Sequence, residues 1–150
     1  MFKILLALHL LFAVFAVGPL VHAATTAARG VRKGDGAATA YSARMLKIYG
    51  YASVLVILVG FGLMSAKAPW NPKQHVAEFS DVWIWLSVLL WLAAVALVLA
   101  VIVPSLEKAT QLIAQQQSVV ALTGRVAAAG GIVGLIFAAV VFLMVYQPGS

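Results

Sequence analysis

The chain has 150 residues, of which 64% are hydrophobic and 9% charged, and its mean hydropathy is +1.06. Soluble domains carry about 25% charged residues, so this composition is that of a membrane protein. The net charge of +6 indicates loops that face anionic lipid headgroups and set the topology, rather than a nucleic-acid surface. Cysteine is absent from these residues, which excludes disulfides, thiolate metal sites and thiol catalysis.

Four stretches without Asp, Glu, Lys or Arg fill most of the chain, at residues 4–28, 48–66, 82–103 and 126–146. A helix rises about 1.5 Å per residue, so about 20 apolar residues cross the hydrocarbon layer of a bilayer. The sequence therefore predicts transmembrane helices at about residues 2–28, 44–66, 82–103 and 119–146. We expect one all-α integral membrane domain over residues 1–150, an up-and-down bundle of four transmembrane helices.

The first predicted span also has the pattern of a secretory signal, with Lys3 before an apolar run and the small-residue site Val21-His22-Ala23. Cleavage after Ala23 would leave three spans and put the following basic segment outside the cell. Charge counting opposes cleavage, because loops one and three hold seven basic residues and the opposite side holds three. We expect an intact first helix in a bacterial inner (plasma) membrane protein, with both termini extracytoplasmic.

Prolines predict where two of the spans bend or stop. Pro19 cannot donate a hydrogen bond to the carbonyl four residues earlier, so a kink is expected there. Pro104 marks a kink or a stop of the third span. Beyond it, apolar residues recur at helical spacing from Leu106 to Val120, which indicates either an interfacial helix or a prolonged third helix. The second helix is expected to begin near Ala37.

Residues 67–81 form the predicted outer loop, in which two prolines break the helix. Trp70 in this loop suits the aromatic belt at a membrane interface. Ser80 or Asp81 is the expected N-cap of the third span, because both side chains can accept hydrogen bonds from the free backbone N–H groups of a first turn.

Small residues recur every four positions in the last span, at Gly130, Gly134 and Ala138. They line one face of the helix, where small side chains let another helix backbone approach closely. Two interpretations remain for this face. It packs inside the protein's own bundle, or it binds a second copy or a partner membrane protein.

Histidine and methionine supply the only candidate cofactor ligands. His9 and His22 lie thirteen residues apart on the first span, about 20 Å along the axis, a spacing similar to that of membrane b-type cytochromes. The remaining His75 lies in the outer loop, so two bis-histidine haems are excluded. Met64 and Met144 lie near the depth of His9, and this set suits haem b or copper. The competing interpretation is a core histidine that satisfies a carbonyl, with methionine as core filler.

Few residues in this sequence are placed to carry out acid–base catalysis. The four acidic residues fall in predicted loops or at helix ends: Asp35, Glu78, Asp81 and Glu107. No carboxylate is left inside a span for a proton relay, and no nucleophile–base motif or phosphate loop is present. The leading interpretation is a small membrane protein without catalytic machinery, an accessory or interaction subunit of a membrane assembly.

Several short motifs follow one another in a familiar order: Leu8-His9, Gly18, Gly60-Phe61-Gly62, a Trp-rich start to the third span, and Val103-Pro104. In this order the chain resembles the bacterial integral membrane family DUF2269, a domain of unknown function similar to the four-helix CopD-like and HemJ-like membrane proteins. The resemblance implies a four-helix membrane fold. CopD-like proteins are implicated in copper uptake and HemJ-like proteins in porphyrin oxidation with a bound haem. His9 is the position that would inherit the role of their first-helix histidine. HemJ-like proteins also rely on an intramembrane lysine, which no span here has at its centre.

Overall fold

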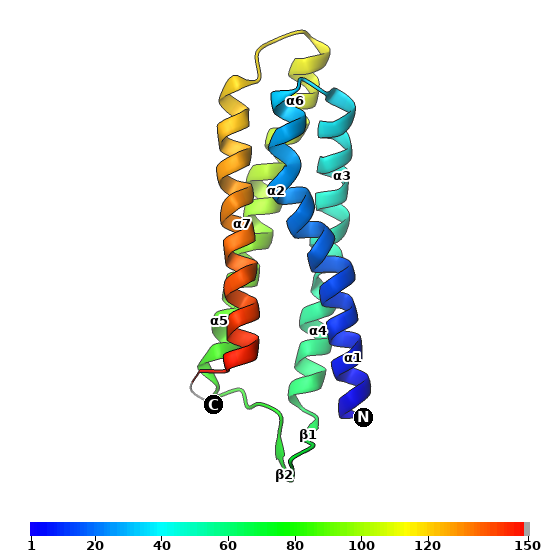
Figure 1. The fold of residues 1–150 in the computed structure, drawn as a ribbon, viewed down its shortest axis with the longest axis vertical. Coiled ribbons are helices and arrows are strands. Elements are labelled where there is room, and N and C mark those ends of the chain that lie inside the picture. Colours follow the sequence, from blue (N-terminus) through cyan, green and yellow to red (C-terminus); the bar gives the residue numbers. More distant parts are fainter. Residues whose placement is uncertain (149–150) are drawn as a thin grey trace.

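The protein is a bundle of four long helical segments in a computed structural model that describes residues 1–148 (Figure 1). The segments are long and apolar enough to cross a membrane, and they cover Phe2–Arg32, Gly36–Met64, Val82–Ala114 and Val120–Tyr146. These bounds confirm the four predicted helices. The first and third segments run one or more turns beyond their apolar cores into charged residues.

The first segment consists of α1 (Phe2–Phe12), a π-helical turn η1 (Ala13–Val17) and α2 (Gly18–Arg32). Pro19 lies just after the π turn and has no N–H to continue the regular hydrogen-bond ladder, so the helix widens by one residue before it. Figure 1 shows the change of direction between α1 and α2 at this point. The bend expected at Pro19 therefore takes the form of a π turn.

The third segment repeats this arrangement with α5 (Val82–Leu97), a π turn η2 (Val98–Ile102) and α6 (Val103–Ala114). Pro104 again follows the π turn by two residues. The helix continues through it, so a stop at Pro104 and a separate interfacial helix are both wrong, and a prolonged third helix is correct. A proline in the first turn after a break costs little, because its missing N–H would have no partner there.

The second segment is α3 (Gly36–Ala52) and α4 (Val54–Met64), with Ser53 between them. Asp35 caps α3, and its carboxylate accepts a hydrogen bond of 3.0 Å from the backbone N–H of Ala38. This cap explains why the helix begins one residue before the position expected from the sequence, since an Asp side chain satisfies an otherwise free N–H of the first turn.

The segment after α4 is more regular than the sequence suggested. It forms a short antiparallel hairpin of β1 (Lys67–Ala68) and β2 (Asn71–His75). Asp81 is the N-cap of α5, as expected, but its side chain accepts no hydrogen bond from that helix. Its carboxylate instead accepts a hydrogen bond of 2.8 Å from the backbone N–H of Glu78 in the preceding loop.

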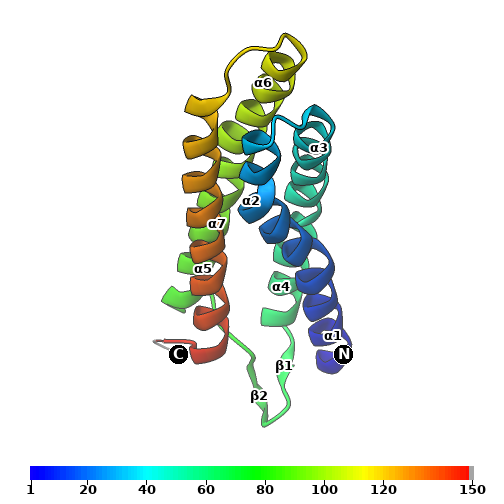
Figure 2. The ribbon, with the colours of Figure 1, turned by 45° about the horizontal axis from the view of Figure 1, so that its top comes forward.

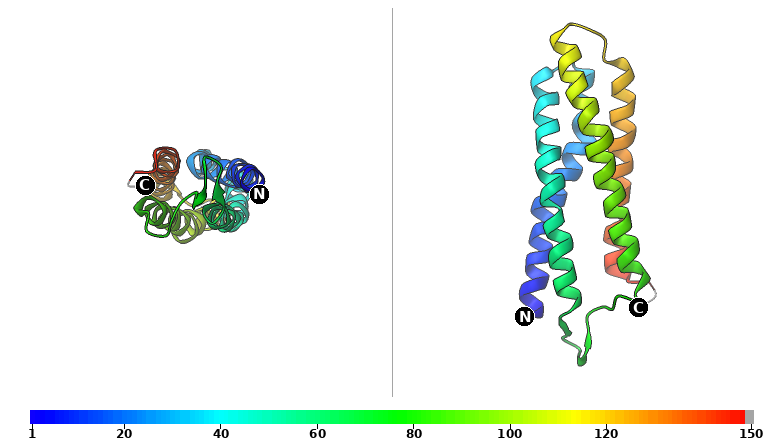
Figure 3. Two further views of the ribbon diagram at one scale, coloured as in Figure 1. Left: turned by 90° about the horizontal axis from the view of Figure 1, so that it is seen from below. Right: turned by 180° about the vertical axis from the view of Figure 1, so that it is seen from behind.

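The last helix is α7 (Val120–Tyr146), and it returns the chain to the end where it began. Both described termini and the hairpin lie at one end of the bundle, and the α2–α3 and α6–α7 connections lie at the other (Figures 1 and 3). This is the up-and-down order that the sequence predicted. Below, the end with the two connections is called the connection end and the other the hairpin end.

Packing is uneven along the bundle. The large buried cluster lies towards the connection end and draws on α2, α3, α5, η2, α6 and α7; its fully buried members include Leu20, Val31, Leu46, Ile102, Leu106, Val126 and Val133. By contrast, α1 has no buried residue along its described length. Towards the hairpin end α1 packs on α4 and α5 packs on α7, and contacts between these two pairs are sparse (Figure 2).

Candidate functional site

His9 lies between α1 and α4 in the hairpin half of the bundle, where it is half-buried. Its Nδ1 lies 3.1 Å from the carbonyl oxygen of Val56. A carbonyl can only accept, so Nδ1 carries the proton and donates, and Nε2 of the neutral ring keeps a free lone pair. The same arrangement orients metal-ligating histidines, which donate from one ring nitrogen and bind through the other.

Gly60 makes room for this ring. A Cβ atom at Gly60 would lie 3.2 Å from Cε1 of His9, tighter than most real contacts of a Cβ. The glycine therefore lets the imidazole lie directly against the helix. The structure thus brings together two of the motifs on which the family resemblance depends, Leu8-His9 and Gly60-Phe61-Gly62.

The two candidate methionine ligands lie in a separate cluster towards the hairpin. Met64 is buried with Ala77, Trp83 and Ile84, and Met144 packs against this cluster from α7. The structure therefore brings Met64 and Met144 into one cluster, and Met64 lies four residues after Gly60, on the face of α4 that contacts His9. Met64 is one helical turn from Gly60, about 6 Å along α4.

A complete metal site is not assembled from other ligand types. Within residues 1–148, no group of three or more His, Asp or Glu side chains is arranged to hold a metal ion. His22 is exposed on α2, and Nδ1 of His75 lies 2.9 Å from the carbonyl oxygen of Ser65 in the hairpin region. Two ring nitrogens are therefore preoriented by a carbonyl contact at Nδ1: Nε2 of half-buried His9 among the helices and Nε2 of exposed His75 near the hairpin.

The small-residue face of α7 is divided between two environments. A Cβ atom at Gly130 would lie 2.1 Å from the carbonyl oxygen of Ala24, so the backbones of α7 and α2 touch at this point. A Cβ atom at Gly134 would lie 3.2 Å from Cγ2 of Thr25. Ala138, however, is exposed. Gly130 and Gly134 therefore pack inside the bundle, and Ala138 does not share their contact.

The neighbouring face of α7 carries a second row of small residues that sequence reasoning missed. Gly124, Ala128, Gly131 and Ala138 are all exposed, and Cβ atoms at Gly124 and Gly131 would meet nothing within 4 Å. Their spacing of three, four and seven residues keeps them on one side of the helix. This set, Gly124, Ala128, Gly131 and Ala138, is called the outer row below. The seven-residue recurrence of Gly124, Gly131 and Ala138 was the signal that could have revealed it.

Two indoles, of buried Trp83 and partly buried Trp91, lie among the helices. Nε1 of Trp91 donates a hydrogen bond of 3.0 Å to Oγ of Ser53, which in turn donates one of 2.6 Å to the carbonyl of Gly50. This contact ties α5 to the junction of α3 and α4. Nε1 of Trp83, in a side chain that is only 7% exposed, has no hydrogen-bond partner among the described residues.

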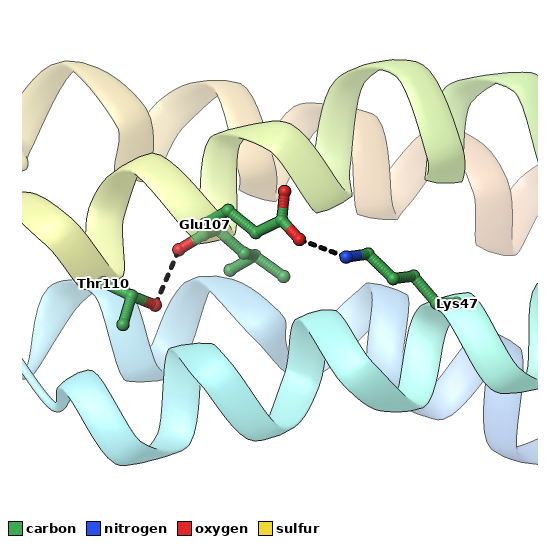
Figure 4. A network of polar contacts seen from close by, with 4 residues as sticks. Lys47, Glu107 and Thr110 are labelled. Atoms are coloured by element: carbon green, nitrogen blue, oxygen red, sulfur yellow. Dashed lines mark hydrogen bonds and ion pairs between the residues drawn. The ribbon is translucent and has the colours of Figure 1, made fainter.

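At the connection end, polar side chains gather between α3 and α6. Lys47 forms an ion pair with Glu107, and Oγ1 of Thr110 donates a hydrogen bond of 2.9 Å to the carbonyl of Leu106 (Figure 4). Oγ1 of Thr39 lies 2.7 Å from that of Thr110, a second bridge between the same helices.

No protein-family model matches the chain, and comparisons with curated proteins and with solved structures found no significant match. The likeness to DUF2269 stays a prediction.

Proposed function

We propose that this chain is a multi-pass protein of the bacterial inner membrane, with the connection end in the cytoplasm and both termini outside. The support is the distribution of charge over the fold. The connection end carries seven of the ten basic residues and the hairpin end carries Lys3, Lys67 and Lys73. Cytoplasmic loops are enriched in Lys and Arg.

Reporter fusions test this orientation. A reporter that is active only outside the cytoplasm should be active when it is fused after Ser150. A reporter that is active only in the cytoplasm should be active when it is inserted near Gly34. The reverse pattern would show that the charge distribution does not set the topology of this protein.

Within the membrane, the protein acts as an accessory subunit that binds another membrane helix through the outer row of α7. The observation that carries this proposal is the open space at Gly124 and Gly131, where a second backbone can approach as closely as α2 approaches Gly130. Small residues are the usual contact surface between membrane helices, because dispersion contacts there replace the hydrophobic drive of water. The partner is either a second copy of this chain or a different membrane protein.

Native mass measurement in mild detergent tests the association. We expect the wild-type chain to migrate as a complex, and Gly131→Leu and Ala128→Leu to release the monomer. The matched control is Ala93→Leu, which makes the same change at an exposed position of α5. A wild-type monomer, or dissociation caused equally by the α5 variant, would contradict a role for the outer row.

The geometry of His9 favours a second function: a haem or copper site of the CopD-like or HemJ-like kind. The hydrogen bond from Nδ1 to the Val56 carbonyl fixes the tautomer whose Nε2 can bind a metal. A bound haem or copper ion would supply redox chemistry, and His9 would orient it.

An absorption spectrum and a copper assay of the purified protein separate the two functions. A haem protein shows a Soret band and a copper protein contains stoichiometric copper. Either signal is expected to disappear in His9→Ala and to persist in the control His22→Ala, because His22 is exposed on α2. Protein that contains neither group would exclude this second function.

A further inference from the structure

A groove between α3 and α6 opens near the connection end of the bundle. It has a volume of about 460 Å³. Arg44, Lys47, Glu107 and Thr110 line its polar part, and the small side chain of Ala40 leaves space beside them. The helices that form it are held together by buried apolar residues and by the Thr39–Thr110 bridge, so the groove is a fixed feature of the fold.

The charges in the groove do not cancel. Lys47 and Glu107 neutralise each other as an ion pair (Figure 4). Arg44 lies one helical turn from Lys47 on α3, and its guanidinium makes no hydrogen bond or ion pair within residues 1–148. One positive charge is therefore left without compensation, on a side chain that can bind a phosphate through two parallel N–H groups.

Below the charges, the same face of α3 becomes apolar. Ile48 lies four residues after Arg44 and Tyr51 four residues after Lys47, so each lies one turn closer to the middle of the bundle. Both are exposed, at 47% and 67%. On α6, Pro104 is exposed one turn from Glu107 in the same direction. The surface thus combines a cationic head region with an apolar track beneath it.

We propose that this groove binds an anionic phospholipid, with the lipid phosphate on Arg44 and an acyl chain along Ile48 and Tyr51. The single negative charge of a phosphodiester matches the single uncompensated cation. Basic pockets between transmembrane helices on the cytoplasmic side are suited to such headgroups. The proposal rests on the membrane placement proposed above, which puts Arg44 at the level of the cytoplasmic headgroups.

Glu107 gives the proposal a second, opposite prediction. Its carboxylate repels a phosphate and also holds Lys47 in the ion pair. Glu107→Gln removes that repulsion and frees Lys47 for the lipid, so binding should strengthen. Arg44→Gln removes the phosphate contact, so binding should weaken. Both residues are exposed, and neither substitution alters the buried core.

The test uses native mass spectrometry of the full chain in mild detergent, titrated with phosphatidylglycerol or phosphatidylcholine of identical acyl chains. We expect tighter binding of phosphatidylglycerol, weakened about fivefold in Arg44→Gln. We expect binding of phosphatidylglycerol to be stronger in Glu107→Gln than in the wild type. Lys108→Gln is the matched control, because it removes one positive charge next to Glu107 but outside the groove lining. Thermal melting followed by circular dichroism verifies that each variant is folded.

Three results would overturn the proposal. The two lipids could bind equally, the Lys108 control could lose as much affinity as Arg44→Gln, or inorganic phosphate alone could displace the phosphatidylglycerol, which would identify a free-anion site. The reporter fusions read orientation independently. Expected reporter activities together with no preference for phosphatidylglycerol would therefore refute the lipid groove alone, and reversed reporters would refute the placement.

Discussion

Substituting Gly130 tests the tightest contact in the bundle. In Gly130→Ala the new Cβ would lie 2.1 Å from the carbonyl oxygen of Ala24 and 2.9 Å from its carbonyl carbon, whereas ordinary contact begins at 3.4 Å. The obstacle is backbone and no rotamer change relieves it, so α2 and α7 have to separate by about 1 Å. Overpacking costs about 1–3 kcal/mol, and a backbone clash belongs at the upper end. The midpoint of thermal unfolding should fall by roughly 6–12 °C for a cost of about 3 kcal/mol.

The adjacent glycine is the control for this prediction. Gly131→Ala adds the same methyl group to the same helix, but its Cβ would meet nothing within 4 Å. Alanine favours a helix over glycine by about 0.5–1 kcal/mol, so this variant should melt at the wild-type temperature or slightly above. Thermal unfolding of both variants as monomers, in one detergent that dissociates the outer-row contact, followed by circular dichroism, gives the comparison. Equal midpoints for the two variants would refute the close crossing of α2 and α7.

Two further predictions concern the polar contacts between helices. Ser53→Ala leaves the indole N–H of Trp91 without its acceptor, which should cost about 1–3 kcal/mol; adding Trp91→Phe should recover part of this loss. A double-mutant cycle measured by thermal unfolding checks the coupling, and strictly additive effects would contradict it. Gly60→Ala should displace the ring of His9 by a few tenths of an ångström and speed exchange of its Nδ1 proton in nitrogen-15 NMR spectra. Gly62→Ala is the control, because its Cβ has looser contacts, and an unchanged His9 signal in Gly60→Ala would contradict the packing described.

The helices were predictable because their ends are chemically marked. Uncharged stretches separated by charged residues predicted four helical segments, and the structure confirms their order. Asp35 directly precedes the start of α3, and its side chain caps that helix. These signals are local, since each depends on residues within a turn or two of the helix end.

The π turns and the hairpin were not predictable in the same way. A proline at position 19 or 104 requires that the helix change locally, but whether it stops, kinks or widens depends on the packing of the neighbouring helices. At Pro104 the buried residues Ile102 and Leu106 on either side hold the helix in line, so it continues. The hairpin after α4 depends on pairing between backbone groups, which the two prolines of the loop obscured.

The use of each face of α7 could not be read from the sequence, because the helix carries two rows of small residues. One recurs every four positions from Gly130 and the other every seven from Gly124. The row that begins at Gly130 is buried because Gly130 packs against Ala24 on α2, more than a hundred residues away in sequence. The contact between His9 and Gly60 is of the same kind. Both residues stood out as motifs, and only the fold shows that they touch.

Photo-cross-linking from the outer row in native membranes tests the central claim most directly. The chain contains no cysteine, so Ile132→Cys, at an exposed position beside the outer row, can be labelled with a benzophenone maleimide and irradiated in the membrane without enlarging the outer row itself. The account predicts a covalent product heavier than the monomer, with a mass that identifies a second copy or a different protein, and no such product from the α5 control Ala93→Cys. Monomer alone from Ile132→Cys, or the same product from both positions, would contradict the claim that α7 binds a partner through its outer row.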